Sequence, residues 1–535
     1  MNSIAAKNLS LAEHVVVTAE QMQRTEGALF AAGMPVSALM EKVAGRIADW
    51  IARQYPVDRT PTLGFIIGPG HNGGDALVVA RELHHQGYRV LPWCPFLRLK
   101  ELTANHKRYL EYLGIAFAAS GLDLCDCDAI VDGGFGFGLA RPLEGEMAEV
   151  IESINQWPIP IISIDVPSGI DTDTGAVLGV AIRARHTLCL GLWKLGLLQD
   201  AALPWVGQAH LIPFDIPASS LRTGLQDSPQ LKRLSTAAAC PHLPLPRPVL
   251  AHKYTAGHAL VIAGSRQYMG AALLAGKGAI ASGVGMLTMV VPESLKLTVV
   301  SQLPEALVLG ASEAADGAIA ALPPSLTWEK YDVVACGPGL TVQADTLMAE
   351  VFECCCPLVL DADGLNWLAQ RSPINSLQQR TYPTLLTPHL GEFRRLFPDL
   401  LAQTSTPTAA AQKAAQCADC TIVLKGAISA IAHPDGQIWF NPNSTPALAR
   451  GGSGDVLTGL VAGLAAQHVK GNLPLEQVFL SAAIAGVWWH AQAGCDLVME
   501  RSLLGCAPSQ LAKYLPLALA KHIGDFASER IHTST

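Results

Sequence analysis

The stretch TLGFIIGPGHNGGDALVVARELHHQ, residues 62–86, decides the fold. Its first six residues are almost all apolar, which predicts a strand buried on both faces of a sheet. Four glycines follow within 68–75, and residues 76–86 carry apolar side chains at helical spacing. Glycines before a helix let backbone N–H groups approach an anion, whereas a plain turn needs fewer of them. The stretch therefore predicts an α/β unit with a ligand site in its loop.

The same succession of apolar run, Gly/Pro/Asp turn and amphipathic helix recurs along the chain. This alternation predicts an α/β fold with a largely parallel sheet. Further buried strands are expected at 129–131, 159–164, 187–192, 259–263, 332–335, 358–360, 384–386 and 421–424. Helical runs at 28–53 and 503–520 are expected to cover sheet faces.

One segment, 219–248, departs from this alternation, with scattered polar residues and then a cluster of four prolines. Such a composition is typical of a linker that is semi-stiff where the prolines gather. We therefore expect an N-terminal domain over 1–222, a linker over 223–248 and a C-terminal domain over 249–535. Each domain is long enough for a hydrophobic core of its own.

The composition excludes several classes of protein. Hydrophobic residues make up 50% of the 535 residues and charged residues 15%, which excludes a long disordered chain. The net charge of −8 argues against a nucleic-acid partner. The mean hydropathy is +0.28, but no apolar run approaches the about 20 residues of a membrane span. Without a recognisable signal peptide, and with 13 cysteines that favour free thiols, the chain is expected to be cytoplasmic and to have no membrane partner.

Polar side chains follow three of the first-half strands. Asn72 follows the first strand and Asp132 ends the second, while Asp165 and Ser168 follow the third. Ligands of open α/β sheets bind at the carboxyl ends of the strands, so we expect these groups to meet there. Asn72, Asp132 and Ser168 offer hard oxygen atoms to a cation, and Asp165 is suited to proton transfer. Lys194 either adds positive charge there or is an ordinary solvated lysine.

The second half carries a stronger phosphate-site pattern, GGSGD at 451–455, directly before an apolar helical run. Glycines there place several backbone N–H groups at a helix N-terminus, where the helix dipole also favours a phosphate. Asp455 is then placed to activate a hydroxyl for attack on a phosphoryl group. An N-cap aspartate is the plain alternative, but it leaves the surrounding glycines unexplained. The chain has no P-loop motif.

Four more motifs follow strands of the second half. They are GPG (337–339), DAD (361–363), TPH (387–389) and KG (425–426). Their shared position makes His389 a site candidate rather than a structural histidine. The carboxylates of Asp361 and Asp363 could hold a phosphate-bound Mg²⁺ through water.

Taken together, these motifs resemble the family of bifunctional NAD(P)H-hydrate repair enzymes, over about residues 19–515. In the N-terminal half the resemblance rests on GPGHNGGD (68–75), VDGGFGFGL (131–139), SIDVPSGIDTDTG (163–175) and Lys194. In the C-terminal half it rests on HKYTAGHALVIAGS (252–265), CGPGL (336–340), LDADGLNWLA (360–369), LLTPHLGEF (385–393), VLKGA (423–427), NPNSTPALARGGSGDVLTG (441–459) and AGVWWHAQAG (485–494).

For the N-terminal half, the resemblance implies a Rossmann-like, three-layer domain that interconverts the R and S hydrates of NADH and NADPH. It implies a potassium ion on Asn72, Asp132 and Ser168, and Asp165 as the catalytic base. The implied substrate contacts are His71, Asn72, Gly73, Gly74, Asp75, Gly136, Phe137, Gly138, Leu139, Ala140, Arg141, Pro142 and Asp165.

For the C-terminal half, the resemblance implies a ribokinase-like α/β domain that dehydrates the S hydrate and converts ADP to AMP and phosphate, with Mg²⁺ present. Phosphorylation of the hydroxyl followed by elimination fits both a kinase-like site and a dehydration. Asp455 is the implied catalytic residue, and a homo-oligomer is expected. The implied substrate contacts are Ala256, Gly339, His389 and Asp455, and the implied nucleotide contacts are Lys425, Gly426, Ala427, Ile428, Ser429 and Gly454.

Four positions depart from the family pattern. His71 replaces an asparagine and Ala76 a glycine, while Gly364 and Arg450 stand where alanine and threonine are common. Two other functions stay open. A vitamin-pathway kinase fused to an accessory domain would release a stable phosphorylated product. An N-terminal half that served only as an interaction scaffold would not need the acids at its strand ends.

Overall fold

The computed structural model describes residues 13–226, 230–341 and 345–531, with side chains to 524. The chain forms two compact units, Met1–Arg233 and Leu234–Thr535. The boundary falls inside the segment 223–248 that was expected to be a linker. Short regular elements lie in and next to that segment: α8 (Ala218–Leu225), β9 (Leu231–Arg233) and α9 (Thr236–Ala239).

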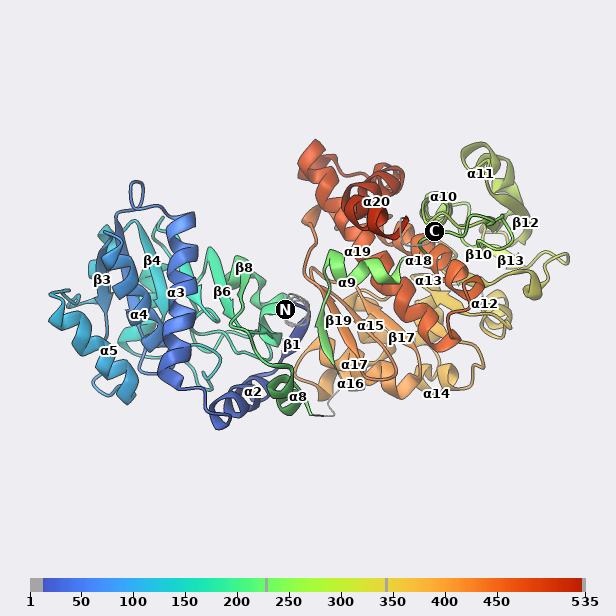
Figure 1. Ribbon diagram of the computed structural model, residues 1–535. Helices are drawn as coiled ribbons and strands as arrows, with labels where there is room; N and C mark the ends of the chain where they lie inside the picture. The colour runs from blue at the N-terminus through green and yellow to red at the C-terminus, as the bar shows by residue number, and fades with distance from the viewer. Residues whose placement is uncertain (1–12, 227–229, 342–344, 532–535) are drawn as a thin grey trace. The chain divides into compact units, whose positions relative to one another are not determined.

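The N-terminal unit is built on a six-stranded sheet with the order β3-β2-β4-β5-β6-β8, in which every neighbouring pair is parallel (Figure 1). The chain reverses its direction across the sheet between β2 and β4, because β3 lies on one side and all later strands lie on the other. Doubly wound sheets bind their ligands at such a switch point. The strands are β2 (Thr62–Ile67), β3 (Arg89–Trp93), β4 (Ala129–Gly133), β5 (Ile161–Ile164), β6 (His186–Leu190) and β8 (Gln208–Ile212).

Helices cover both faces of this sheet, as a three-layer fold requires. Phe65 and Ile67 of β2 pack into a core with α2, α3 and α4, whereas Ile66 packs into a second core with α6 on the opposite face. This alternation follows from the two-residue period of a strand. The helices are α2 (Ala19–Ala31), α3 (Val36–Gln54), α4 (His71–His85), α5 (Glu101–Tyr112) and α6 (Glu146–Ile154), and the short strands β1 (Val15–Val17) and β7 (Trp193–Lys194) pair in parallel.

The prediction of a single helix over 28–53 is wrong. α2 ends at Ala31 and α3 begins at Val36. Gly33 between them has a φ of 99°, which ends a helix, and Pro35 is the N-cap residue of α3. α2 starts earlier than the apolar pattern indicates, in a capping box formed by Thr18 and Gln21.

The C-terminal unit is built on a longer sheet with the order β13-β12-β11-β10-β14-β15-β16-β17-β18-β19. The strands from β12 to β17 are parallel to their neighbours, and β13, β18 and β19 add antiparallel edges. The strands are β10 (His258–Ile262), β11 (Met286–Pro292), β12 (Leu307–Glu313), β13 (Ile319–Ala321), β14 (Val333–Cys336), β15 (Leu358–Leu360), β16 (Thr384–Leu386), β17 (Thr421–Leu424), β18 (Ser429–Ala432) and β19 (Ile438–Asn441).

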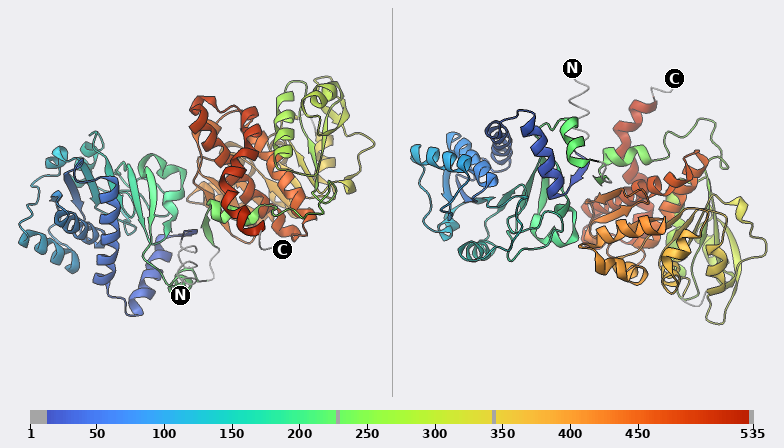
Figure 2. Two further views of the ribbon diagram at one scale, coloured as in Figure 1. Left: turned by 45° about the horizontal axis from the view of Figure 1, so that its top comes forward. Right: turned by 90° about the horizontal axis from the view of Figure 1, so that it is seen from below.

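Four long helices form one large core with this sheet, and two further views show how they gather (Figure 2). They are α10 (Met269–Ala281), α18 (Ser453–Lys470), α19 (Leu475–Arg501) and α20 (Pro508–Ile531). Glycine allows the close packing of α18 on α10, because a Cβ at Gly459 would lie 1.8 Å from the carbonyl oxygen of Ala275. The helix expected at 503–520 is α20, which starts later because Leu503–Gly505 forms a separate 3₁₀ turn.

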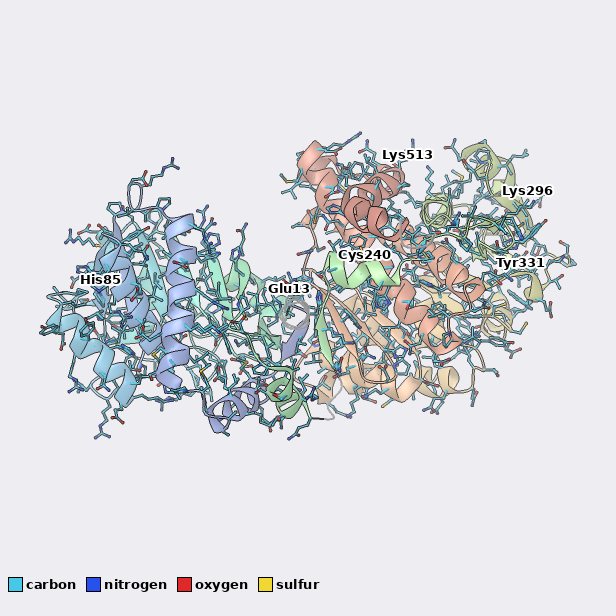
Figure 3. All side chains as sticks on the ribbon, viewed as in Figure 1. Glu13, His85, Cys240, Lys296, Tyr331 and Lys513 are labelled. Atoms are coloured by element: carbon cyan, nitrogen blue, oxygen red, sulfur yellow. The ribbon has the colours of Figure 1, made fainter. Side chains whose placement is uncertain are left out.

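Shorter helices connect the central strands of the second sheet. They are α12 (Asp345–Phe352), α13 (Asp363–Ala369), α14 (Pro373–Gln378), α15 (Leu390–Leu396), α16 (Pro398–Gln403) and α17 (Pro407–Ala418), and α11 (Lys296–Gln302) connects β11 to β12. Side chains fill the layers of each unit (Figure 3). Within the described ranges, no helix is both long enough and apolar enough to cross a membrane.

Candidate active sites

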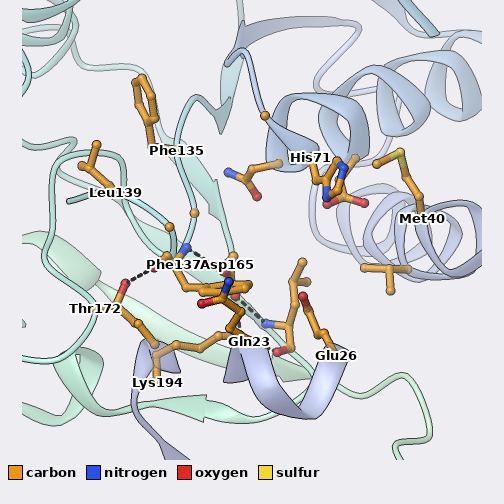
Figure 4. A pocket seen from close by; sticks show the side chains of 18 of the residues that line it. Gln23, Glu26, Met40, His71, Phe135, Phe137, Leu139, Asp165, Thr172 and Lys194 are labelled. Carbon is orange, nitrogen blue, oxygen red and sulfur yellow. Dashed lines mark hydrogen bonds and ion pairs between the residues drawn. The ribbon is translucent and has the colours of Figure 1, made fainter. Parts of the chain in front are cut away.

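A cavity of about 1060 Å³ lies at the carboxyl ends of β2, β4 and β5 in the N-terminal unit (Figure 4). The loops after these strands form one wall, and α2 and α3 form the other. The predicted site residues that line it are His71, Asn72, Asp75, Gly136, Phe137, Gly138, Leu139, Ala140 and Asp165, and Lys194 lines it as well. Four predicted contacts, Gly73, Gly74, Arg141 and Pro142, are not among the lining residues.

Asp165 lies in the loop wall and forms an ion pair with the fully buried Lys194, with 2.5 Å between Oδ1 and Nζ. The backbone N–H of Phe137 donates to the other carboxylate oxygen at 3.1 Å. Burial is the largest single effect and lowers the pKa of Lys194, but the charge of Asp165, its hydrogen bond and the charges of Cys189 and Glu26 together outweigh burial, so the pKa lies above its ordinary value. Asp165 also has a φ of 70°, a conformation that costs a non-glycine residue about 1–3 kcal/mol and is found at functional sites.

The glycine-rich motif turns out to be partly helical, since α4 begins at His71 with Gly70 as its N-cap. A Cβ at Gly68 would lie 1.6 Å from the carbonyl oxygen of Gly134, and one at Gly73 would lie 2.0 Å from that of Gly68. These glycines therefore let the loop after β2 and the first turn of α4 pack against the loop after β4. They do not line the cavity themselves, but they fix the positions of the loops that do.

Asp132 and Ser168 form a buried cluster behind the same loops. Ser168 donates to Asp132 through its hydroxyl at 2.6 Å and its backbone N–H at 2.9 Å, and Ser163 and Gly134 donate two further hydrogen bonds. Burial raises the pKa of Asp132, and these hydrogen bonds partly offset the rise. Among the residues that the structure describes, no lysine or arginine forms an ion pair with Asp132.

The predicted potassium ligands consist of hard oxygen donors, which is what an alkali cation requires. The Asn72 amide lies close to Asp165, because a Cβ at Gly136 would lie 3.3 Å from Oδ1 of Asn72 and 3.0 Å from Oδ2 of Asp165. The same amide donates to the carbonyl of Ile164 at 3.3 Å. A buried carboxylate that pairs with no lysine or arginine in the described ranges, and an amide oxygen on the cavity side, fit a cation chemically.

Two further carboxyl groups in this cavity have raised pKa values. Burial, followed by the charges of Asp165 and Glu26, raises the pKa of Asp75 well above its usual range. Burial raises the pKa of Glu26 to about 7, with Lys194 opposing the rise and Asp165 adding to it. Sequence reasoning missed Glu26, because it belongs to no motif and lies on a helix that was not predicted there.

At the C-terminal site, Asp361 follows β15 and accepts hydrogen bonds from Lys425 at 2.8 Å and from the hydroxyl of Thr458 at 2.7 Å. Burial alone would raise the pKa of Asp361, but Lys425 and these hydrogen bonds lower it below its ordinary value. Asp361 therefore ties the loop after β17 to the start of α18. Asp363 accepts the backbone N–H of Thr341 at 3.0 Å.

Asp455 lies in the first turn of α18 beside this ion pair. Burial, and then the charge of Asp361, raises the pKa of Asp455 to about 6, while Lys425 opposes the rise. Gly454 lies against the same lysine, since its Cβ would be 3.3 Å from Nζ. The buried His490 of α19 contacts the carbonyl of Ser453 at 3.0 Å and so holds the start of α18.

The other predicted residues of the C-terminal site lie in the loops that follow its strands. A Cβ at Gly339 would lie 2.7 Å from Cβ of Tyr268 and 3.0 Å from Cβ of Ala271, so this glycine contacts the start of α10. His389 is exposed, caps α15 and pairs with Lys425 in a backbone bridge. The turn from Lys425 to Ser429 joins β17 to β18.

Ala256 is not brought to this site. It precedes β10, so it lies at the amino end of the strand, and the adjoining Gly257 packs against Ala466 in the second half of α18. Eleven residues of helix separate Ala466 from Asp455, a distance of about 16 Å at 1.5 Å per residue. At the carboxyl edge of the sheet, Tyr268 and Ala271 lie against Gly339. The sequence did not indicate these two residues, because only the folded chain shows their contact with the glycine.

Two family descriptions match the chain: "NAD(P)H-hydrate dehydratase" over residues 259–517 and "YjeF-related protein N-terminus" over residues 36–196. The bifunctional NAD(P)H-hydrate repair enzyme of Thermosynechococcus vestitus is 50% identical over 94% of this chain and 96% of that protein. That of Synechocystis sp. is 49% identical over 95% of each chain. A solved ADP/ATP-dependent NAD(P)H-hydrate dehydratase from Bacillus subtilis, co-crystallised with ATP and Mg²⁺, is 32% identical, covering 56% of this chain and 99% of that one, with a TM-score of 0.46.

Proposed function

This chain belongs to the family of bifunctional NAD(P)H-hydrate repair enzymes, and we propose how its two units divide the repair. The N-terminal unit interconverts the R and S hydrates of NADH and NADPH, and the C-terminal unit dehydrates the S hydrate with ADP. The observation that carries this proposal is that each unit has a separate set of polar groups at the carboxyl ends of its own parallel strands. Each set joins a lysine–aspartate pair to a further acid.

The epimerisation follows from the chemistry of the hydrate. Adding water to the enamine of the reduced ring places the hydroxyl on the carbon next to the ring nitrogen. Inverting that carbon breaks its C–O bond and re-forms it on the other face. Asp165, paired with Lys194 and bound by the N–H of Phe137, takes the proton of the entering water.

Potassium is the cation proposed for this unit, with Asn72, Asp132 and Ser168 as its ligands. A bound cation there would balance the buried charge of Asp132 and add positive charge beside the substrate hydroxyl. The oxygen donors and the missing ion-pair partner of Asp132 within the described part of the chain support this assignment.

The dehydration proceeds through transfer of the β-phosphoryl group of ADP to the hydroxyl of the S hydrate, which releases AMP. Loss of phosphate, together with a proton from the neighbouring carbon, then restores the double bond. Asp455 takes the hydroxyl proton, and Gly454 and the turn from Lys425 to Ser429 bind the phosphates through backbone N–H groups and the lysine. Gly339 and His389 border the substrate.

Mg²⁺ would reach this site on the phosphates of the nucleotide, as it does in most phosphoryl-transfer sites. Asp361 already pairs with Lys425, so its first role is to position that lysine. Of the two aspartates, Asp363 is therefore the better candidate to hold the ion through water. The described residues contain no cluster of three or more His, Cys, Asp or Glu side chains suited to a metal.

Separated hydrates test the two assignments independently. Pure R hydrate without ADP should convert to the S form faster with the protein than in an enzyme-free control. Pure S hydrate with ADP should give reduced nucleotide, AMP and phosphate in equal amounts. A phosphorylated hydrate that persists would favour the vitamin-pathway kinase, and an unchanged R hydrate would favour the scaffold function of the N-terminal unit.

A cytoplasmic, homo-oligomeric protein is also proposed. Support for association comes from large apolar side chains that are almost fully exposed, among them Leu97, Val249 and Leu250. Light scattering on the purified chain tests the oligomer, and a single-chain mass would contradict it. Cell fractionation tests the location.

A further inference from the structure

The two walls of the N-terminal cavity carry acids of different character. Asp165 belongs to the loop wall and is held in the ion pair with Lys194. Glu26 belongs to the wall formed by α2 and α3, and it lines the same cavity (Figure 4). Among the described residues, no hydrogen bond or ion pair holds the Glu26 side chain, although it is half-buried. A half-buried acid without a partner is free to exchange a proton with a molecule in the cavity.

We propose that Glu26 is a second catalytic residue of the epimerisation, donating a proton from the helical wall while Asp165 accepts one from the loop wall. This inference rests on the epimerase function proposed above and deepens it. Epimerisation needs such a pair, because water leaves from one face of the ring and enters from the other. One carboxylate cannot serve both faces.

The steps balance in atoms and protons. Glu26 protonates the hydroxyl of the R hydrate, the C–O bond breaks, and the lone pair of the ring nitrogen forms a C=N⁺ bond as water leaves. Water then adds to the opposite face of that carbon and gives its proton to Asp165. The S hydrate results, with Glu26 ionised and Asp165 protonated. The reverse conversion, or proton exchange with solvent, restores the starting state.

The charges that face Glu26 suit this role. Asp165 after β5 favours its protonated form, while Lys194 of β7 and Lys100, which precedes α5, oppose it. The charge of Glu26 in turn helps to raise the pKa of the buried Asp75 on α4. On its own helix, Glu20 pairs with Arg24 at 3.0 Å. With burial as the largest cause, the pKa of Glu26 rises to about 7, so both protonation states are populated at neutral pH. An acid whose pKa lies near the working pH is the most effective proton donor and acceptor.

The test uses the full-length chain with Glu26→Gln, and with Glu152→Gln on the exposed side of α6 as a matched control. Glutamine keeps the shape of the side chain but has no carboxyl proton. We expect epimerisation of the R hydrate to fall about 100-fold or more in kcat, the usual contribution of general acid–base catalysis, with KM little changed. ADP-dependent dehydration of pure S hydrate by the same preparation should be unaffected, and Glu152→Gln should match the unchanged chain.

The pH profile separates a catalytic role from a structural one. In the unchanged chain, kcat/KM for epimerisation should fall as the pH rises through about 7, because Glu26 loses its proton. Glu26→Gln should lack this alkaline limb, and Glu26→Asp should recover part of the rate and keep a limb. If Glu26→Gln fails to fold, the test uses Glu26→Asp instead. The pH at which its kcat/KM falls should then differ from that of the unchanged chain, and an identical pH profile would count against Glu26.

The outcomes are distinguishable. An unchanged chain that does not epimerise the R hydrate would overturn the proposed function of the N-terminal unit itself. An unchanged chain that epimerises, with Glu26→Gln at the same rate and with the same alkaline limb, would overturn the role of Glu26 alone.

Discussion

At the scale of single residues, each candidate site contains a buried lysine whose charge is stabilised by an ion pair with an aspartate. Lys194 is fully buried against Asp165, and Lys425 is largely buried against Asp361. Removing one partner of such a pair leaves an uncompensated charge and costs about 3–5 kcal/mol, far more than breaking an exposed pair. These lysines therefore hold the shape of the sites as well as their charge.

Substituting Lys425→Met tests this dependence. We expect the free energy of unfolding of the C-terminal unit to fall by about 3 kcal/mol, because Asp361 would keep its charge without a partner. Urea denaturation measures the loss, with the exposed Lys413→Met as control. Equal stability of the two variants would show that the Lys425–Asp361 pair does not hold the site together.

The pKa of Asp455 determines the pH dependence that we expect for the dehydration. Its pKa is raised to about 6 by burial and by Asp361, so it is ionised at neutral pH and becomes protonated as the pH falls through about 6. A protonated base cannot accept the hydroxyl proton, and kcat/KM should fall on this acid side. Asp455→Asn should lower the rate about 100- to 10,000-fold. Initial rates on S hydrate between pH 5 and 8 check this; a flat profile would exclude Asp455 as the base.

The motif residues could be placed from sequence because strand ends can be recognised from apolar runs. The family predicted from these motifs is confirmed by the relatives, and Asp165 and Asp455 lie at the carboxyl ends of their sheets as expected. Ala256 was misplaced because a motif does not say at which end of a strand a residue lies. Glu26 was missed because burial and neighbouring charge, which make it notable, come only from the folded chain.

At the scale of elements, close packing between loops decides the shape of the N-terminal cavity. Gly68→Ala should destabilise the N-terminal unit and abolish epimerisation, because the added Cβ would overlap the carbonyl oxygen of Gly134. Thermal unfolding and the epimerisation rate measure the two effects. Gly45→Ala is the control, since nothing lies within 4 Å of its Cβ and alanine favours the helix. If Gly68→Ala unfolded at the same temperature as the unchanged chain, the loops could not be packed this closely.

Strands with continuous apolar runs were the elements best predicted. β2, β15, β16 and β17 have the predicted bounds, because strands buried on both faces carry no polar interruptions. The break between α2 and α3 was missed, since helical periodicity continues across Gly33 and Pro35. The short elements on either side of the boundary between the units were missed, because their scattered polar residues and the prolines that follow them, at 241–248, suggested an open linker.

At the scale of the whole molecule, each unit has its own hydrophobic core and its own set of candidate site residues. The two activities should therefore be separable by substitution. Asp165→Asn should abolish epimerisation and leave dehydration of S hydrate unchanged, and Asp455→Asn should do the reverse. Rates on separated hydrates measure both, with circular dichroism to verify folding. Loss of both activities in either variant would contradict the independence of the units.

If both units act as proposed, one chain returns both hydrates to NAD(P)H. The most direct measurement follows the recovery of reduced-nicotinamide absorbance from a mixture of R and S hydrates with Mg²⁺ and K⁺, with and without ADP. We expect full recovery of both epimers with ADP, faster than spontaneous epimerisation allows in a control without enzyme. Without ADP we expect no recovery. Recovery that stops at the S fraction would contradict the epimerase assignment, and no recovery with either ADP or ATP would contradict repair altogether.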